Sequence, residues 1–126
     1  MKRWIAGILA IFNGANGLVM LFAGPFWWEH VPGVMDTGPF NPHLVEDVGA
    51  AYLTAGLALG ARALWPRTWP AAVAVAGFLA LHALLHLGMI AGGHDHHAAS
   101  NVAAVIVPAI LALYAASPSK GESQHA

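Results

Sequence analysis

Two histidines, His82 and His86, stand four residues apart in the apolar stretch Phe78-Leu79-Ala80-Leu81-His82-Ala83-Leu84-Leu85-His86-Leu87-Gly88-Met89. On an α-helix this spacing places both imidazoles on one face, with Cβ atoms about 5–6 Å apart. Imidazole nitrogens bind transition metals, exchange protons and form hydrogen bonds. Because ionisable groups are costly in apolar surroundings, they usually face a protein interior, a cavity or a partner. The pair therefore marks a candidate site.

A second group, His43-x-x-Glu46-Asp47, also has the spacing of one helical face. Imidazole and carboxylate donors suit Zn, Fe or Mn, and the methionines of the chain keep Cu in this set. We therefore predict a transition-metal site formed by His43, Glu46, Asp47, His82 and His86. Hydrogen bonds from nearby amide side chains would orient these ligands, and the candidates for that role are Asn13, Asn16 and Asn101.

The composition indicates that these groups lie in a membrane protein. Of the 126 residues, 58% are hydrophobic and 9% are charged, which is far from the balance of a soluble domain. With five Lys and Arg in total, an electrostatic surface for nucleic acid is not expected. The chain has no cysteine, which excludes disulfides and thiolate metal sites.

The charged residues divide the chain into four apolar spans, predicted at 4–23, 43–65, 69–92 and 98–116. Each is close to the roughly 20 residues that cross a bilayer as a helix. Pro108 lies in the middle of the fourth span, where we expect a kink. We predict an all-α, integral membrane four-helix bundle in one transmembrane domain, 1–117, followed by a polar tail, 118–126.

The second span is short of charge-free residues. Only fourteen uncharged residues separate Asp47 from Arg62, and as a helix they cover about 21 Å of a hydrocarbon core of about 30 Å. Arg62 can extend outward on its long side chain, so Glu46 and Asp47 are expected to enter the membrane. Gly56 and Gly60 should let a neighbouring helix approach closely.

A loop rich in Gly and Pro is predicted at 24–41, with Phe26, Trp27 and Trp28 as an interfacial aromatic belt. Asn41 can cap the second span, with Pro42 in its first turn. A further loop, Gly93-His94-Asp95-His96-His97, is rich in histidine. It could capture or ligate a metal, or be a solvated loop without a function.

With four spans, both termini lie on the side that receives the loop between spans two and three. All five basic residues fall on that side: Lys2, Arg3, Arg62, Arg67 and Lys120. The positive-inside rule makes this side, and both termini, cytoplasmic. Five of the six acids and most histidines fall on the opposite side. The expected location is a bacterial inner (cytoplasmic) membrane, in a multi-pass protein.

Several functions remain open at this point. The first is the metal site near the outer face. A second is a haem- or quinone-associated redox accessory protein; for haem, His43 would have to supply the ligand opposite His82 or His86. Proton or ion passage and a non-catalytic membrane scaffold subunit are further alternatives. Besides the lipid bilayer, partners would be copies of the chain or another membrane complex. No nucleophile and base pattern identifies an enzyme.

Residues 31–87 carry a resemblance to known proteins. Val31-Pro32-Gly33-Val34-x-Asp36-Thr37-Gly38-Pro39-Phe40-Asn41-Pro42-His43, Asp47-Val48-Gly49-x-Ala51-Tyr52-Leu53 and the histidine stretch resemble a group of small bacterial four-span membrane proteins. The overall layout is similar to the broad DoxX-like class. The resemblance implies a four-helix bacterial membrane protein in which the loop and second span act as one unit, and it supplies no activity.

Overall fold

The computed structural model describes residues 1–119 and 121–122, and these form helices joined by short loops. The elements, in order, are α1 (Lys2–Phe22), α2 (Gly24–His30), η1 (Met35–Thr37), α3 (Pro42–Leu64), η2 (Pro66–Thr68), α4 (Trp69–Ala91), α5 (Ala98–Asn101), η3 (Val102–Ile106) and α6 (Val107–Ala116). Four stretches are long and apolar enough to cross a membrane: Lys2–Phe22, Pro42–Leu64, Pro66–Ala91 and Ala98–Ala116. The predicted all-α fold with four spans is confirmed.

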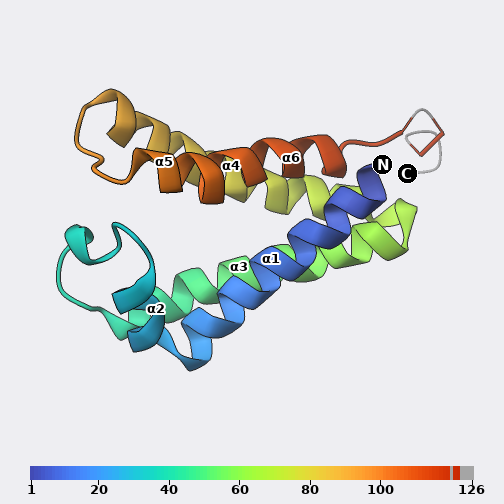
Figure 1. The fold of residues 1–126 in the computed structure, drawn as a ribbon. Helices are drawn as coiled ribbons and strands as arrows, with labels where there is room; N and C mark the ends of the chain where they lie inside the picture. Colours follow the sequence, from blue (N-terminus) through green and yellow to red (C-terminus); the bar gives the residue numbers. More distant parts are fainter. Residues whose placement is uncertain (120, 123–126) are drawn as a thin grey trace.

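The long helices form two pairs. α1 packs along α3, and α4 packs along α6 and the segment before it. Figure 1 shows the pairs close together at the end where α1 begins and separated at the opposite end, where α2, η1 and α5 lie. The bundle is therefore closed at one end and splayed at the other.

Glycines explain the closeness of α1 and α3. A Cβ added to Gly56 would lie 2.6 Å from the backbone nitrogen of Gly14, and one added to Gly17 would lie 2.5 Å from the backbone nitrogen of Leu53. Each is nearer than real side-chain carbons approach, so the two backbones could not keep this separation with larger residues. The predicted role of Gly56 is confirmed, whereas a Cβ on Gly60 would make an ordinary contact at 3.6 Å.

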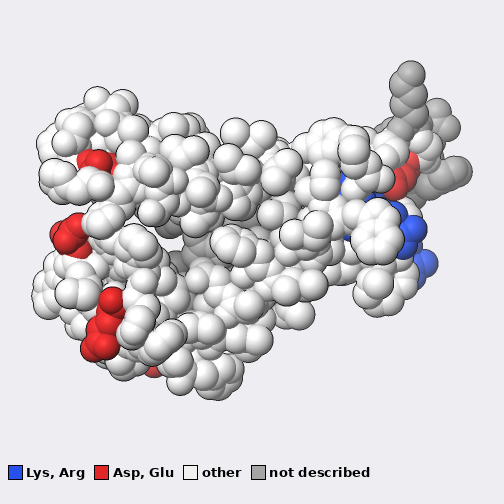
Figure 2. Space-filling view, in the orientation of Figure 1, with Lys and Arg blue, Asp and Glu red and all other residues white. Residues whose placement is uncertain are grey.

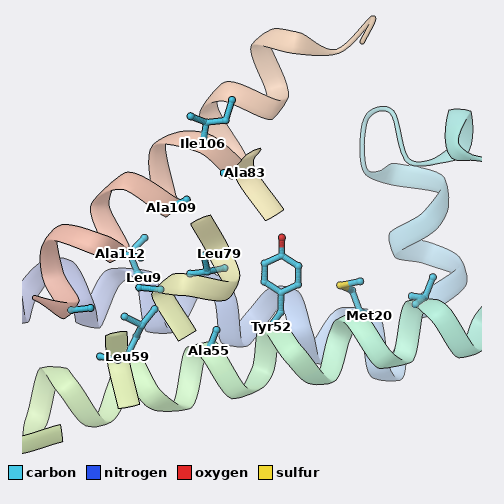
Figure 3. Close-up of a cluster of buried hydrophobic side chains, with 14 residues drawn as sticks. Leu9, Met20, Tyr52, Ala55, Leu59, Leu79, Ala83, Ile106, Ala109 and Ala112 are labelled. Carbon is cyan, nitrogen blue, oxygen red and sulfur yellow. The ribbon is translucent and has the colours of Figure 1, made fainter. Parts of the chain in front are cut away.

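Buried alanines allow the helices of the second pair, α4 and α6, to approach each other closely. Ala72, Ala76 and Ala83 of α4 and several alanines of α6 are buried in one apolar cluster with Leu9, Leu59 and Leu79. Figure 3 shows this cluster between the helices, with the side chain of Tyr52 rising from α3 toward the other pair. Small side chains therefore set the helix distances, and a few large ones fill the remaining space.

Two segments predicted to be irregular, the region around Pro108 and the loop 24–41, contain helical turns in the structure. Ahead of Pro108, residues Val102–Ile106 adopt a π-helical turn, because proline has no N–H to continue the α-helical hydrogen bonds. Part of the predicted loop 24–41 is instead helical: Gly24–His30 forms α2, with proline in its first turn. The Asn41 cap is confirmed, since its Oδ1 accepts a hydrogen bond from the Leu44 backbone nitrogen at 3.2 Å.

The closed end is held by the basic residues. Lys2 Nζ donates to Ser117 Oγ at 2.8 Å, and Arg3 Nε donates to the carbonyl of Ala63 at 2.7 Å. The side chain of Arg62 is 1% exposed and donates to both carboxylate oxygens of Glu122, at 3.0 and 2.8 Å. The expectation that Arg62 extends outward is therefore wrong, because Glu122 neutralises it inside the bundle end.

Charge is separated along the molecule. Figure 2 shows the described Lys and Arg side chains at the closed end, with one acidic group beside them, and the other Asp and Glu side chains at the splayed end. This is the segregation that the sequence predicted. Lys120 and residues 123–126 of the predicted polar tail lie outside the described residues.

Candidate functional site

A cavity of about 460 Å³ lies between the two helix pairs at the splayed end. Figure 2 shows an opening between the two halves of the molecule in this region. The wall contributed by the first pair includes Phe12 and Asn16 of α1, Trp27 and Trp28 of α2 and Tyr52 of α3. The wall contributed by the second pair includes His82, Leu85, His86 and Met89 of α4 and Asn101 of α5. Most of the lining is apolar or aromatic, with polar groups at particular points.

His82 and His86 line this cavity from one face of α4, as their spacing predicted. Their ring centroids are 4.8 Å apart, at an interplanar angle of 65°. Tyr52 reaches His82 from the other helix pair, with ring centroids 5.8 Å apart in an edge-to-face arrangement. Phe78 lies beside both rings, 5.7 Å from Tyr52 and 6.2 Å from His82. This aromatic contact bridges the two pairs and fixes the His82 ring.

His86 retains unused hydrogen-bonding capacity. Its Nδ1 is buried and has no hydrogen-bond partner among the described residues. A buried ring nitrogen without a partner is unfavourable by about 1–3 kcal/mol, since it has lost its contact with water. The residue lines the cavity, but this nitrogen is itself enclosed by protein, so a ligand would meet the rest of the imidazole ring.

Loops from both pairs meet at the splayed end. Asp36 Oδ2 in η1 lies 3.3 Å from His97 Nε2 in the loop before α5, and both residues line the cavity. Gly33 has φ +83°, and a Cβ there would lie 3.1 Å from Cδ2 of the His97 ring. Glycine therefore permits both the backbone turn and the close approach of His97.

Asp95 organises the second of these loops. Its Oδ2 accepts from Asn101 Nδ2 at 2.8 Å, and its Oδ1 accepts from the His97 backbone nitrogen at 2.7 Å. The hydrogen bond from Asn101 is the main reason that the pKa of Asp95 lies below its ordinary value, with the His97 N–H and the charges of His86 and His97 acting in the same direction. Asp95 thus stays ionised beside the cavity histidines.

The aromatic residues of α2 do more than face the membrane interface. Trp27 Nε1 donates to Asn16 Oδ1 at 2.9 Å, which ties α2 to α1. Trp27 and Trp28 are half-buried against the core and line the cavity, whereas Phe26 is exposed and stacks on His30 at 4.1 Å. Only part of the predicted aromatic belt therefore faces outward.

The structure does not bring the five predicted metal ligands together. His43 and Asp47 form a pair of their own at 3.6 Å, with 85% and 66% of their side chains exposed. Neither these two residues nor Glu46 line the cavity with His82 and His86. Within residues 1–119 and 121–122, no three His, Asp or Glu side chains are placed to hold a metal ion. The predicted metal centre has no geometric support.

Of the three asparagines predicted to orient the metal ligands, two line the cavity and one does not. Asn16 and Asn101 line the cavity and hold Trp27 and Asp95 in place. Asn13 is buried, and its Nδ2 donates to the carbonyl of Leu9 in its own helix at 2.7 Å. It stabilises α1 and does not line the cavity.

Sequence reasoning missed Tyr52, Trp27, Trp28 and Asp36 as cavity residues. A signal for Asp36 existed, because its loop and the histidine-rich loop were both predicted on the outer side. No sequence signal placed Tyr52 in the cavity, because a single tyrosine in an apolar helix does not indicate which neighbour its side chain faces.

Comparison with known proteins gives no further guide to this site. No protein-family model, no curated protein and no solved structure matches the chain.

Proposed function

We propose that this chain is a multi-pass protein of a bacterial cytoplasmic membrane that binds a small amphiphilic molecule between its helix pairs. The apolar part of the ligand would lie against Phe12, Leu85 and Met89, and its polar head group would bind at His86. The acidic, splayed end would face outward, as the positive-inside rule predicts for the distribution of charge.

The observation that carries this proposal is the mostly apolar cavity between the helix pairs, which two neighbouring imidazoles of α4, His82 and His86, line from one side. A volume of about 460 Å³ falls within the range of about 300–1,000 Å³ typical of small-molecule sites. Such sites combine apolar walls with a few fixed polar groups, and Asn16, Asp95 and Asn101 supply these here.

A quinone-type ring fits this chemistry best among the ligands considered from the sequence. Its flat ring can stack on Trp27, Trp28 or Tyr52, and its carbonyl can accept a hydrogen bond from an imidazole N–H. Haem fits less well because His82 and His86 project from one face of α4, and His43 does not line the cavity.

We leave a transition metal out of this proposal. His82 and His86 provide two imidazole donors, and among the described residues no third His, Asp or Glu joins them in a group that could hold a metal ion. Protein metal sites of the predicted kind need three or four such donors.

The proposal can be tested by titrating the detergent-purified protein with a short-chain naphthoquinone. Trp27 and Trp28 line the cavity, so binding should quench tryptophan fluorescence with a saturable dependence on concentration. Replacing His86 by leucine should weaken binding about tenfold, the effect of losing one hydrogen bond to a buried group. His43→Leu is the matched control, because it removes an exposed histidine outside the cavity. Equal affinities in the two variants would refute the proposal.

A further inference from the structure

A second cavity lies at the closed end of the bundle, apart from the one described above. It has a volume of about 830 Å³ and is lined by Lys2, Arg3, Trp4, Arg62, Tyr114 and Glu122, among others. Three of these side chains are cationic and one is acidic. Figure 2 shows the basic groups gathered here, far from the acids of the splayed end.

The cations differ in how many of their donors are used. Lys2 Nζ contacts the Ser117 carbonyl, the Ser117 hydroxyl and the Pro118 carbonyl, so its three N–H groups have partners. Arg62 is engaged by both oxygens of Glu122, although its Nε is buried without a partner among the described residues. This wall of the cavity therefore already holds one oxyanion.

Arg3 is the group with spare capacity. It is exposed, and it donates from Nε to Ala63 and from Nη2 to Leu64, both through backbone carbonyls at the end of α3. A guanidinium carries five N–H donors in a planar fork, which leaves three for another acceptor. Arg3 has no carboxylate partner among the described residues, because the acid at this end, Glu122, is bound to Arg62.

The surroundings favour a lipid as the source of that acceptor. The cavity lies at the ends of membrane-spanning helices, and Trp4, which lines it, is 80% exposed. Tryptophan and basic residues at such a position are typical of contact with lipid head groups, and basic pockets between spans bind anionic ones.

We propose that this cavity binds the phosphate of an anionic phospholipid, with Arg3 as the main ligand and Lys2 supplying further positive charge. The lipid would join α1 to the ends of α3 and α6 at the closed end. This site is separate from the cavity at the splayed end, so it does not depend on the function proposed for that cavity.

The test is the thermal stability of the full chain in detergent mixed with phosphatidylglycerol, phosphatidylcholine or inorganic phosphate. Phosphatidylglycerol should raise the Tm, and phosphatidylcholine should not. Apparent affinity for phosphatidylglycerol should fall about fivefold in Arg3→Gln, the effect expected for one basic residue near a membrane surface. Arg67→Gln is the matched control, because Arg67 is exposed and does not line this cavity.

Arg3→Gln also removes hydrogen bonds to α3, so the quantity compared is the Tm increment caused by lipid within each variant. Lys2→Gln provides a second variant if Arg3→Gln does not fold, and its increment should also fall. Equal increments in the Arg3 and Arg67 variants, or in the two lipids, would overturn the proposal. An equal increment with inorganic phosphate alone would overturn the lipid as the source of the anion.

Discussion

Asp36 Oδ2 and His97 Nε2, which lie 3.3 Å apart, join the two helix pairs across the splayed end of the bundle. The residues come from the loop before α3 and the loop after α4, and both line the cavity. When His97 is protonated this contact is an ion pair, with 64% of the Asp36 side chain and 40% of the His97 side chain exposed. An exposed pair of this kind contributes about 1 kcal/mol or less, enough to influence local opening but not global folding.

We therefore expect Asp36→Asn to loosen the end of the cavity without unfolding the bundle. Amide hydrogen exchange in residues 92–97 should accelerate by up to about fivefold, corresponding to about 1 kcal/mol, with the Tm almost unchanged. Asp47→Asn is the control, because it disrupts the other exposed histidine–aspartate pair, which lies within α3 and outside the cavity. Equal acceleration in both variants would show that the Asp36 contact does not hold the loops.

The hydrogen bonds of Asp95 predict a specific dependence on pH. Since they lower the pKa of the folded state, Asp95 stabilises the loop above the unfolded-state pKa of about 3.9, and this contribution is lost as pH falls through the lowered folded value. The His97 amide proton, which donates to Asp95, should report this titration by NMR.

Removing the main cause of the shift should move that titration. Asn101→Ala deletes the hydrogen bond at 2.8 Å, so the Asp95 titration should move to higher pH, toward about 3.9. Thr54→Ala, which deletes an exposed side-chain hydrogen bond within α3, should leave the titration unchanged. An unchanged titration in Asn101→Ala would contradict the arrangement of this loop.

The close packing of α1 and α3 predicts sensitivity to a single methyl group. In Gly56→Ala the new Cβ would lie 2.6 Å from the Gly14 nitrogen and 2.9 Å from the Ala10 carbonyl oxygen, so the helices must separate. We expect a loss of about 1–3 kcal/mol in unfolding free energy, measured by denaturation in mixed micelles. Gly77→Ala is the control, because no atom other than the adjacent backbone of its own helix lies within 4 Å of its added Cβ. It should be neutral or stabilising, since alanine favours helix. A similar loss in both variants would exclude the close contact as the cause.

The spans could be predicted from the sequence because length and apolarity act locally. Four stretches satisfy the membrane's length requirement without any knowledge of packing, and the Asn41 cap depends on its own helix. The separation of basic from acidic residues could also be predicted from the sequence, because an even number of spans determines which loops and termini lie on the same side.

The composition of the cavity could not be predicted in the same way. In a membrane helix, the lipid-facing and protein-facing sides are both apolar, so the pattern along α3 does not show which face meets α4. The sequence pattern therefore groups His43, Glu46 and Asp47 with His82 and His86, although these three residues lie on an exposed face of α3. The contact that joins α3 to the histidines is made by Tyr52, which has no distinguishing neighbours in the sequence.

Ligand binding between the helix pairs is the central claim, and photoaffinity labelling with an azido-naphthoquinone tests it most directly. After illumination of the purified protein and peptide mapping, labelling should concentrate on cavity residues such as Phe12, Leu85 and Met89. An excess of unlabelled naphthoquinone should suppress it, and His86→Leu should reduce it about tenfold. Labelling that is not suppressed by competitor, or that falls equally on exposed residues outside the cavity such as Ile11 and Leu57, would contradict the account.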